Sequence, residues 1–446
     1  MFAHHHTRVV RAVEVDTPEL EMHAAPAGFP FLLQESAGGI AIIEPPTLFL
    51  FSKFLPIRRD PGKIGNYFAV ALNSAIAVAN DLKDWWKFLD RSCRAWRDAD
   101  QEDFECYRDV MLSTISPHTG RKYRPTTVKR RMVSVLQFYQ WAQSKRLCLT
   151  HIARVPVPNR FARPVQYQAG EATAKKNERN DVLPRTSYSH WEHVRVLSVA
   201  TYQKVAGHIG ALPTDAPSDS MDCQCRLGVE LAIQLGLRIN EVTGLTVAQI
   251  QSLGESAANS LGLRYLRIDR TKGNKPRKIV FPGWLVAELN HYIANQRRSA
   301  LQQGRALELG YETDALLLND ARARQHCGQP LTDQTLRRKF GIAQFKSGLV
   351  RNITKHDPEK GKQSEVEATL FRFHDLRHTY AVWLYYAEKL SGNPEPWKTI
   401  QARLGHEYLS TTQDIYLRAT AEFEAEVSDA MSADLAAGAM IGLGNS

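Results

Sequence analysis

The chain has 446 residues, 43% of them hydrophobic and 23% charged, and its formal net charge is +10 at pH 7. This composition excludes a disordered or fibrous protein. The chain is too long to fold around one ordinary hydrophobic core, so we expect two or three domains. The basic excess favours nucleic acid over a membrane as partner, although many soluble proteins are mildly basic and bind no polyanion. No apolar run reaches the ~18 residues that cross a bilayer.

The six cysteines are scattered, and only Cys223 and Cys225 lie close together. A single C-x-C pair is a poor zinc signal, so we expect free thiols in a reducing compartment and neither a metal nor a cofactor. The first ten residues lack the apolar core of a signal peptide. The expected location is the cytoplasm, at the nucleoid in a bacterium.

Residues 1–65 are predicted to form an N-terminal extension with a few strands, because prolines interrupt every pattern in this segment. Residues 66–150 are predicted to form a helical domain. Apolar residues recur there at helical spacing in three stretches, 72–89, 102–114 and 126–142.

Basic residues cluster at the start of the third helix: Arg121, Lys122, Arg124, Lys129, Arg130 and Arg131. A run of charges is usually a solvated face, but one sign dominates here, so we interpret the cluster as DNA-binding through the phosphates. Thr126 or Thr127 is the expected N-cap of this helix, with Pro125 preventing helix before it.

Residues 151–188 are polar and rich in proline, which is typical of a linker. Residues 189–420 are predicted to form a helical domain with one small sheet. The predicted strands 263–270 and 277–281 flank a hairpin tip at Gly273 and Asn274. The predicted helices are 226–250 with a break at Gly236, 283–300, 375–389, 395–404 and 411–424.

The acidic tail 421–446 has apolar residues along one side of a predicted helix. This helix is expected either to pack on its own domain or to dock on a neighbouring subunit. The fold class is therefore mainly α with a small antiparallel β-sheet.

Four segments of the second domain hold residues suited to chemistry on an anion, and each signal is weak alone. Arg238 lies in a break between helices, and Lys272 lies at the tip of the predicted hairpin. His374 and Arg377 share one helix face near a helix N-terminus, where an anion is well placed. The last segment places His406 in a connection after Gly405, which is expected to end a helix, and Tyr416 on the next helix.

Together these segments resemble the tyrosine recombinase family, the site-specific recombinases of the phage integrase type. The family signature is Arg, Lys, His-x-x-Arg, His and Tyr in this order, which the chain matches with Arg238, Lys272, His374, Arg377, His406 and Tyr416. The surroundings match too, with G-L-R-x-x-E, K-G-N-K, H-D-L-R-H-T, L-G-H and S-T-T-x-x-x-Y. The resemblance covers 189–420 closely and 67–150 by architecture alone. It does not reach 1–65, and the insert 350–368 and the linker are longer than a minimal member needs.

The resemblance implies transesterification of DNA through a 3′-phosphotyrosine, with Tyr416 as nucleophile. This reaction passes through a negatively charged, five-coordinate phosphorus. Two arginines are suited to stabilise that charge, because each guanidinium donates paired hydrogen bonds to phosphate oxygens. A phenol with a pKa of ~10 needs a base near neutral pH, and the 5′-oxygen needs an acid. By resemblance, His374 is the base and Lys272 the acid.

The resemblance also implies a C-shaped clamp on DNA, made by a helical core-binding domain and a mixed α/β catalytic domain. The expected partners are double-stranded DNA recombination sites and three further copies of the chain in a homo-tetramer, with an accessory DNA-bending or directionality protein as a further option. Membrane is not an expected partner. Integration, excision or resolution of a mobile element is the expected task.

Three alternatives remain open from the sequence. A type IB topoisomerase or a telomere resolvase uses similar groups, and relaxation of plasmid without a special site would distinguish it. A DNA-binding regulator with an inactive catalytic fold would bind DNA without becoming attached to it. A basic helical scaffold without catalysis would need six coincidences in the right order.

Overall fold

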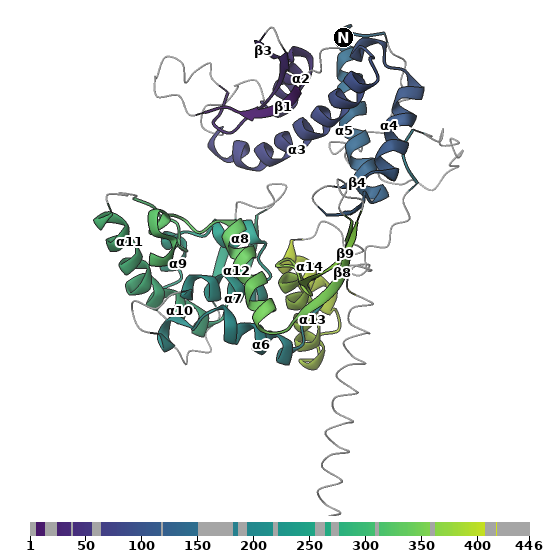
Figure 1. The fold of residues 1–446 in the computed structure, drawn as a ribbon. Helices are drawn as coiled ribbons and strands as arrows, with labels where there is room; N and C mark the ends of the chain where they lie inside the picture. The colour runs from purple at the N-terminus through teal and green to yellow at the C-terminus, as the bar shows by residue number, and fades with distance from the viewer. Residues whose placement is uncertain are drawn as a thin grey trace, which may run out of the picture. The chain divides into compact units, whose positions relative to one another are not determined.

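The computed structural model describes most of the chain, and Figure 1 shows its course. The described residues are 6–13, 25–36, 39–55, 64–116 (side chains from 72), 119–149, 182–185, 194–216, 222–254, 264–268, 276–307, 312–356, 362–405 and 416. The chain divides into two compact units, Met1–Ser187 with Thr354–Ser364, and Tyr188–Ile353 with Glu365–Ser446. Helices dominate both units and the sheets are small, which confirms the predicted fold class.

The first unit begins with a three-stranded antiparallel sheet in the order β1 (His6–Arg11), β2 (Pro30–Ser36) and β3 (Gly39–Ile42). Helix α2 (Glu44–Phe54) follows, with proline in its first turn, where the missing N–H costs no hydrogen bond. Leu32 of the sheet and Leu50 of α2 are both fully buried in the same core as the helices that follow. The sheet and α2 therefore share one core with the helical part of this unit.

Three long helices complete the first unit and match the predicted stretches: α3 (Ile64–Arg91), α4 (Gln101–Ser113) and α5 (Pro125–Ser144). Trp85 of α3 lies at their centre, with ring centroids 4.8 Å from Phe104 and 5.0 Å from Tyr107. Its indole N–H donates to the Tyr139 hydroxyl at 3.2 Å. Aromatic packing thus holds the three helices together.

The predicted start of α5 was wrong by one or two residues. Pro125 is the first helical residue and Arg124 is the N-cap, so neither Thr126 nor Thr127 caps the helix. The fixed φ of proline suits the first helical position, where its lack of an N–H costs no bond.

Shorter elements close the first unit: η2 (Trp96–Asp98), β4 (Ile115–Ser116) and β5 (Arg121–Lys122). Residues 354–364 belong to this unit, and the backbone N–H of His356 donates to the Gly120 carbonyl at 2.9 Å.

Helix α7 (Cys223–Leu235) is almost wholly buried at the centre of the second unit. It is contacted by α6 (Val199–Ile209), α10 (Gly283–Ala294), α12 (Asp333–Lys346) and α13 (Asp375–Leu390). α7 ends at Gly236, whose φ of +64° lies in the left-handed region. Glycine adopts this conformation without strain, so the helix ends at Gly236, as predicted.

The two predicted strands are present as β6 (Arg264–Ile268) and β7 (Arg277–Phe281), an antiparallel pair with Leu266 opposite Ile279. The predicted tip at Gly273 and Asn274 lies outside the described residues. The rest of the segment 226–250 forms the short helices α8 (Ile239–Thr243) and α9 (Val247–Gln251). The predicted helix 283–300 is two helices, because α10 ends and α11 (Gln296–Ala306) begins at the non-helical Asn295.

The remaining elements are η4 (Pro213–Asp215), η5 (Ala321–His326), β8 (Val350–His356), β9 (Gln363–Thr369) and α14 (Pro396–Leu404). β8 and β9 form a two-stranded sheet that spans the predicted insert 350–368. α14 ends at Gly405, with φ +67°, as predicted. The predicted helix 411–424 and the tail 421–446 lie outside the described residues, apart from Tyr416.

No helix in the described ranges is both long and apolar enough to span a membrane. Within the same ranges, no group of three or more His, Cys, Asp and Glu side chains is arranged to hold a metal ion.

Candidate active site

Four of the six predicted catalytic residues lie in the described part of the chain: Arg238, His374, Arg377 and Tyr416. They come from the start of α8, from α13 and from the segment after α14. Lys272 and His406 lie outside the described residues.

Arg238 is the N-cap residue of α8 and follows the left-handed turn at Gly236. Its Nη1 donates to Oε1 of Glu241 at 2.9 Å, and its backbone N–H donates to Oε2 at 2.8 Å. The side chain keeps 22% of its surface exposed. It is therefore anchored at its base while it remains accessible to a ligand.

Glu241 joins Arg238 to a second arginine, Arg277, the first residue of β7. Arg277 donates to both carboxylate oxygens, at 2.8 and 2.6 Å, and its Nε donates to the Arg403 carbonyl at 3.1 Å. Burial by itself raises the pKa of Glu241, but the bonds from Arg277 and the charge of Arg238 outweigh it and lower the pKa to about 2. Glu241 is thus a carboxylate that fixes two arginines.

Arg377 lies between His374 and His378 in sequence, but its side chain turns inward and is only 2% exposed. Nη2 donates to the Leu404 carbonyl at 2.5 Å, and Nη1 donates to the Gly236 carbonyl. Burial and the neighbouring Arg238 and Arg277 lower its pKa to about 9, so it keeps its charge at neutral pH. Arg377 therefore joins the ends of α7 and α14 and adds positive charge beneath the site.

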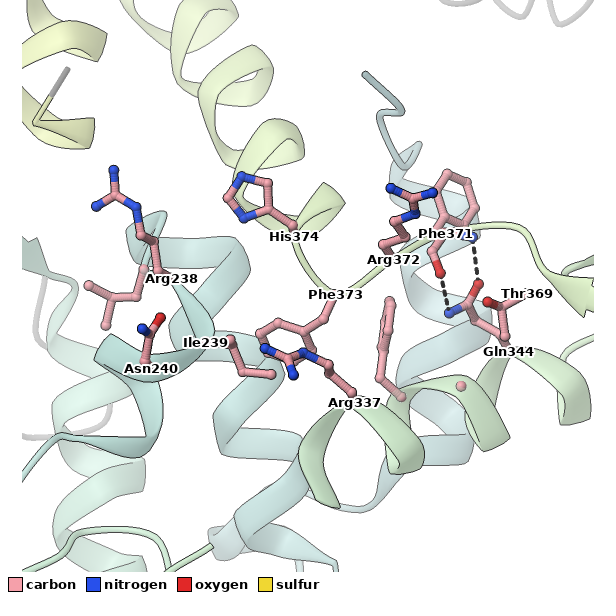
Figure 2. A pocket seen from close by; sticks show the side chains of 13 residues that line it. Arg238, Ile239, Asn240, Arg337, Gln344, Thr369, Phe371, Arg372, Phe373 and His374 are labelled. Carbon is pink, nitrogen blue, oxygen red and sulfur yellow. Dashed lines mark hydrogen bonds between the residues drawn. The ribbon is translucent and has the colours of Figure 1, made fainter. Parts of the chain in front are cut away.

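His374 lies at the start of α13 and is exposed. The segment before it is held by Gln344 of α12, which donates to the Phe371 carbonyl at 3.0 Å and accepts from the Phe371 N–H at 2.8 Å (Figure 2). Asp375 accepts from the Arg372 N–H at 2.8 Å, which closes the turn into the helix. These bonds fix where the His374 ring projects.

His374 and Arg238 line one pocket of about 510 Å³ (Figure 2). Its remaining lining combines apolar side chains, the uncharged polar residues Asn240, Gln344 and Thr369, and two exposed arginines, Arg337 and Arg372. The lining places positive charge from three segments around one opening, which suits a phosphate-bearing ligand.

Tyr416 is 1% exposed and packs against Ala381 and Val382 of α13 and Ile400 and Leu404 of α14. Its Oη lies 3.0 Å from Nδ1 of His378. Burial raises its pKa to about 12, and the charges of Arg377 and Arg238 act in the opposite direction. A phenol in this setting keeps its proton at neutral pH unless a base removes it.

The structure therefore places Arg238 and Arg377 close enough for their charges to act on Tyr416, and His374 lines a pocket with Arg238. Two further residues are linked to this set and were not among the predicted site residues: Arg277, through Glu241, and His378, which contacts Tyr416. Both had a signal in the sequence. Arg277 alternates with Ile279 and Phe281 on the buried face of a strand, so it needed a buried partner, and His378 is four residues after His374 on one helix face.

The predicted DNA-binding residues fall into two groups. Arg130 and Arg131 form ion pairs with the acidic residues Asp81 and Asp84 of α3, at 2.5 and 2.7 Å. Arg121, Lys122 and Arg124 are exposed and Lys129 is half-buried. The first pair fixes α5 against α3, although Arg130 keeps 51% of its side chain exposed.

Residues 208–422 match the phage integrase family. This chain carries a tyrosine recombinase domain of the phage integrase family. The recombinase is 24% identical to tyrosine recombinase XerC of Listeria welshimeri over 352 residues, which cover 79% of this chain and 89% of that relative. It is also 24% identical to tyrosine recombinase XerD of Shewanella oneidensis over 195 residues, which cover 44% and 49%.

Two solved structures are also similar to the recombinase. The XerH site-specific recombinase bound to a palindromic difH substrate in a post-cleavage complex is 16% identical, with a TM-score of 0.47 and coverage of 81% of both chains. The Tn1549 transposon integrase in complex with circular intermediate DNA is 16% identical, with a TM-score of 0.43 and coverage of 84% of this chain and 98% of that one.

As a member of this family, the recombinase cleaves and rejoins DNA strands and performs site-specific recombination.

Proposed function

We propose that Tyr416 is the nucleophile of this tyrosine recombinase and that Arg238 and Arg377 stabilise the phosphate that it attacks. The observation that carries the proposal is the position of the buried phenol, because the charges of both arginines act to lower its pKa against the effect of burial. Charge that favours the ionised phenol also favours the negative charge that develops on the phosphate oxygens.

In the proposed reaction, Oη of Tyr416 forms a bond to phosphorus while the bond from phosphorus to the 5′-oxygen breaks. The products are a 3′-phosphotyrosine and a free 5′-hydroxyl, and reversal of the step by another 5′-hydroxyl rejoins the strand. The phenolic proton passes to an imidazole of α13, and Lys272 gives a proton to the leaving oxygen. His374 and His406 donate hydrogen bonds at the phosphate.

We propose that Glu241 and Arg277 position the site and do not take part in proton transfer. Glu241 holds Arg238 and Arg277 at once, and its low pKa keeps it ionised throughout the neutral range. A carboxylate that cannot be protonated at neutral pH is a poor acid and a poor base.

The proposed DNA clamp combines the helical core-binding domain 66–150 with the catalytic domain 189–420, joined by the linker 151–188. The exposed cations Arg121, Lys122 and Arg124 support phosphate contacts by the first domain. We propose that the recombinase acts as a homo-tetramer on DNA in the cytoplasm, with the tail 421–446 in contact with a neighbouring subunit. The proposed task is integration, excision or resolution of a mobile element, with an accessory DNA-bending or directionality protein where the task requires one.

The test is covalent trapping with nicked duplexes taken from DNA that flanks the gene. The nick lets the short 5′-fragment diffuse away, so a cleaved complex accumulates and runs as a shifted band on a denaturing gel. The wild type should give this band and Tyr416→Phe should not. A covalent band that persists in Tyr416→Phe would place the nucleophile elsewhere.

A further inference from the structure

The phenol of Tyr416 meets His378, four residues beyond the histidine that the family signature contains. Oη of Tyr416 lies 3.0 Å from Nδ1 of His378, within the range of a direct hydrogen bond. The two rings meet edge to face, with centroids 5.5 Å apart and planes at 61°. His378 is half-buried, so the contact is sheltered from water.

His374 and His378 are four residues apart on α13 and lie on the same face of the helix. Their ring centroids are 4.8 Å apart with planes at 87°. His374 is exposed and lines the pocket with Arg238, whereas Tyr416 is 1% exposed. The three rings therefore follow one another from the surface to the core in the order His374, His378, Tyr416.

We infer that His378 holds the Tyr416 phenol and receives its proton during strand cleavage. The inference rests on the proposed function, in which Tyr416 is the nucleophile. In the resting state the Tyr416 hydroxyl donates to Nδ1, and the His378 tautomer carries its hydrogen on Nε2. As the bond from Oη to phosphorus forms, the phenolic proton moves to Nδ1, and His378 becomes an imidazolium until the reverse step returns the proton.

The surroundings of the phenol support an imidazole in this role. Arg377 of α13 and Arg238 at the start of α8 both act on Tyr416 through their charge, and neither guanidinium can accept a proton. α14 faces the phenol with apolar Ile400 and Leu404. His374, predicted as the base from the family signature, stays at the pocket, where its ring can donate to a phosphate oxygen.

Two substitutions of His378 separate proton transfer from positioning. His378→Asn keeps a polar atom near the position of Nδ1 but cannot take a proton, and His378→Ala removes both properties. The measurement is the rate of the first covalent adduct on a nicked duplex, from pH 6 to pH 9 at saturating enzyme. DNA band shifts confirm that each variant still binds, and His326→Ala, an exposed histidine on η5, serves as the matched control.

His378→Ala should lower the rate by at least ~10²-fold, the usual contribution of a positioned acid–base group. The wild-type rate should level off once the imidazole is neutral. For His378→Asn the rate should be lower than that of the wild type and keep rising about tenfold per pH unit, because only phenol ionised by water reacts and its pKa is raised to about 12. His326→Ala should follow the wild type.

Two results would overturn the inference. One is a His378→Asn variant with the rate and pH profile of the wild type, since a structural role would be restored by an amide. The other is a profile that changes in His374→Ala but not in His378→Ala. Tyr416→Phe, measured beside them, separates the failures: if it still forms the adduct, the proposed nucleophile is wrong and the inference falls with it.

Discussion

Arg277 and Glu241 form a buried bidentate ion pair, with Nη1 to Oε1 at 2.8 Å and Nη2 to Oε2 at 2.6 Å. The pair links β7, which follows Lys272 in the chain, to α8, which begins after Arg238. Glu241 is also 4.0 Å from Arg377, so one carboxylate faces three guanidinium groups. The excess positive charge is what a DNA phosphate would neutralise.

Glu241→Gln should destabilise the recombinase by about 3–5 kcal/mol, because removing one partner of a buried pair leaves the other charges without compensation. Urea titration of the full chain measures the change. Glu395→Gln is the control, since Glu395 pairs with Lys398 at the surface and both side chains are more than half exposed. An exposed pair of this kind contributes about 1 kcal/mol or less, so equal effects of the two substitutions would contradict the role assigned to Glu241.

The low pKa of Glu241 also predicts that the folded recombinase loses stability in acid. Its pKa is lowered from 4.5 to about 2 in the folded state, so its ionised form stabilises the protein above about pH 4.5. This contribution, about 3 kcal/mol, should be lost as the pH falls from 4.5 towards 2. The difference in free energy of unfolding between the wild type and Glu241→Gln should therefore shrink over this range. A difference that is independent of pH would show that the Glu241 pKa is not depressed.

Gly236→Ala should destabilise the catalytic domain by more than the strain of a positive φ alone can explain. Gly236 has φ +64°, and a Cβ atom there would overlap the Tyr380 ring, with Cε1 at 2.7 Å. Gly254 is the matched control for strain alone, because its φ is +76° and no atom lies within 4 Å of the place that a Cβ would take. Gly254→Ala should cost about 1–2 kcal/mol and Gly236→Ala clearly more, with loss of cleavage. Equal costs in thermal unfolding would mean that Tyr380 moves aside freely.

Lys122→Gln should weaken DNA binding and reduce its dependence on salt. An exposed lysine that contacts one phosphate contributes about 0.9 to the slope of log K against log salt concentration. Arg8→Gln is the control in the same unit, because Arg8 is paired with Glu35 at 2.6 Å. Fluorescence anisotropy between about 50 and 200 mM salt measures both slopes. An unchanged slope in Lys122→Gln would remove this residue from the proposed DNA surface.

The sequence predicted the helical fold well, because helices depend on local patterns. Apolar periodicity placed α3, α5 and α13, and Gly236 and Gly405 marked helix ends through their left-handed backbone. The break at Asn295 was missed because Gln, Arg and Ala after it are all good helix formers.

Contacts between distant segments could not be read from local patterns. The pairing of Arg277 with Glu241 spans 36 residues, and that of His378 with Tyr416 spans 38. β8 and β9 were also missed, because their residues are mostly polar on both faces and lack the alternation that marks a half-buried strand.

The most direct test of the central claim is to identify the residue that carries DNA after cleavage. The trapped wild-type complex would be digested with protease and nuclease, and the nucleotide-linked peptide sequenced by mass spectrometry. The account predicts a single modified peptide in which the 3′-phosphate is attached to Tyr416. A phosphate attached to any other tyrosine, or to a serine, would contradict it.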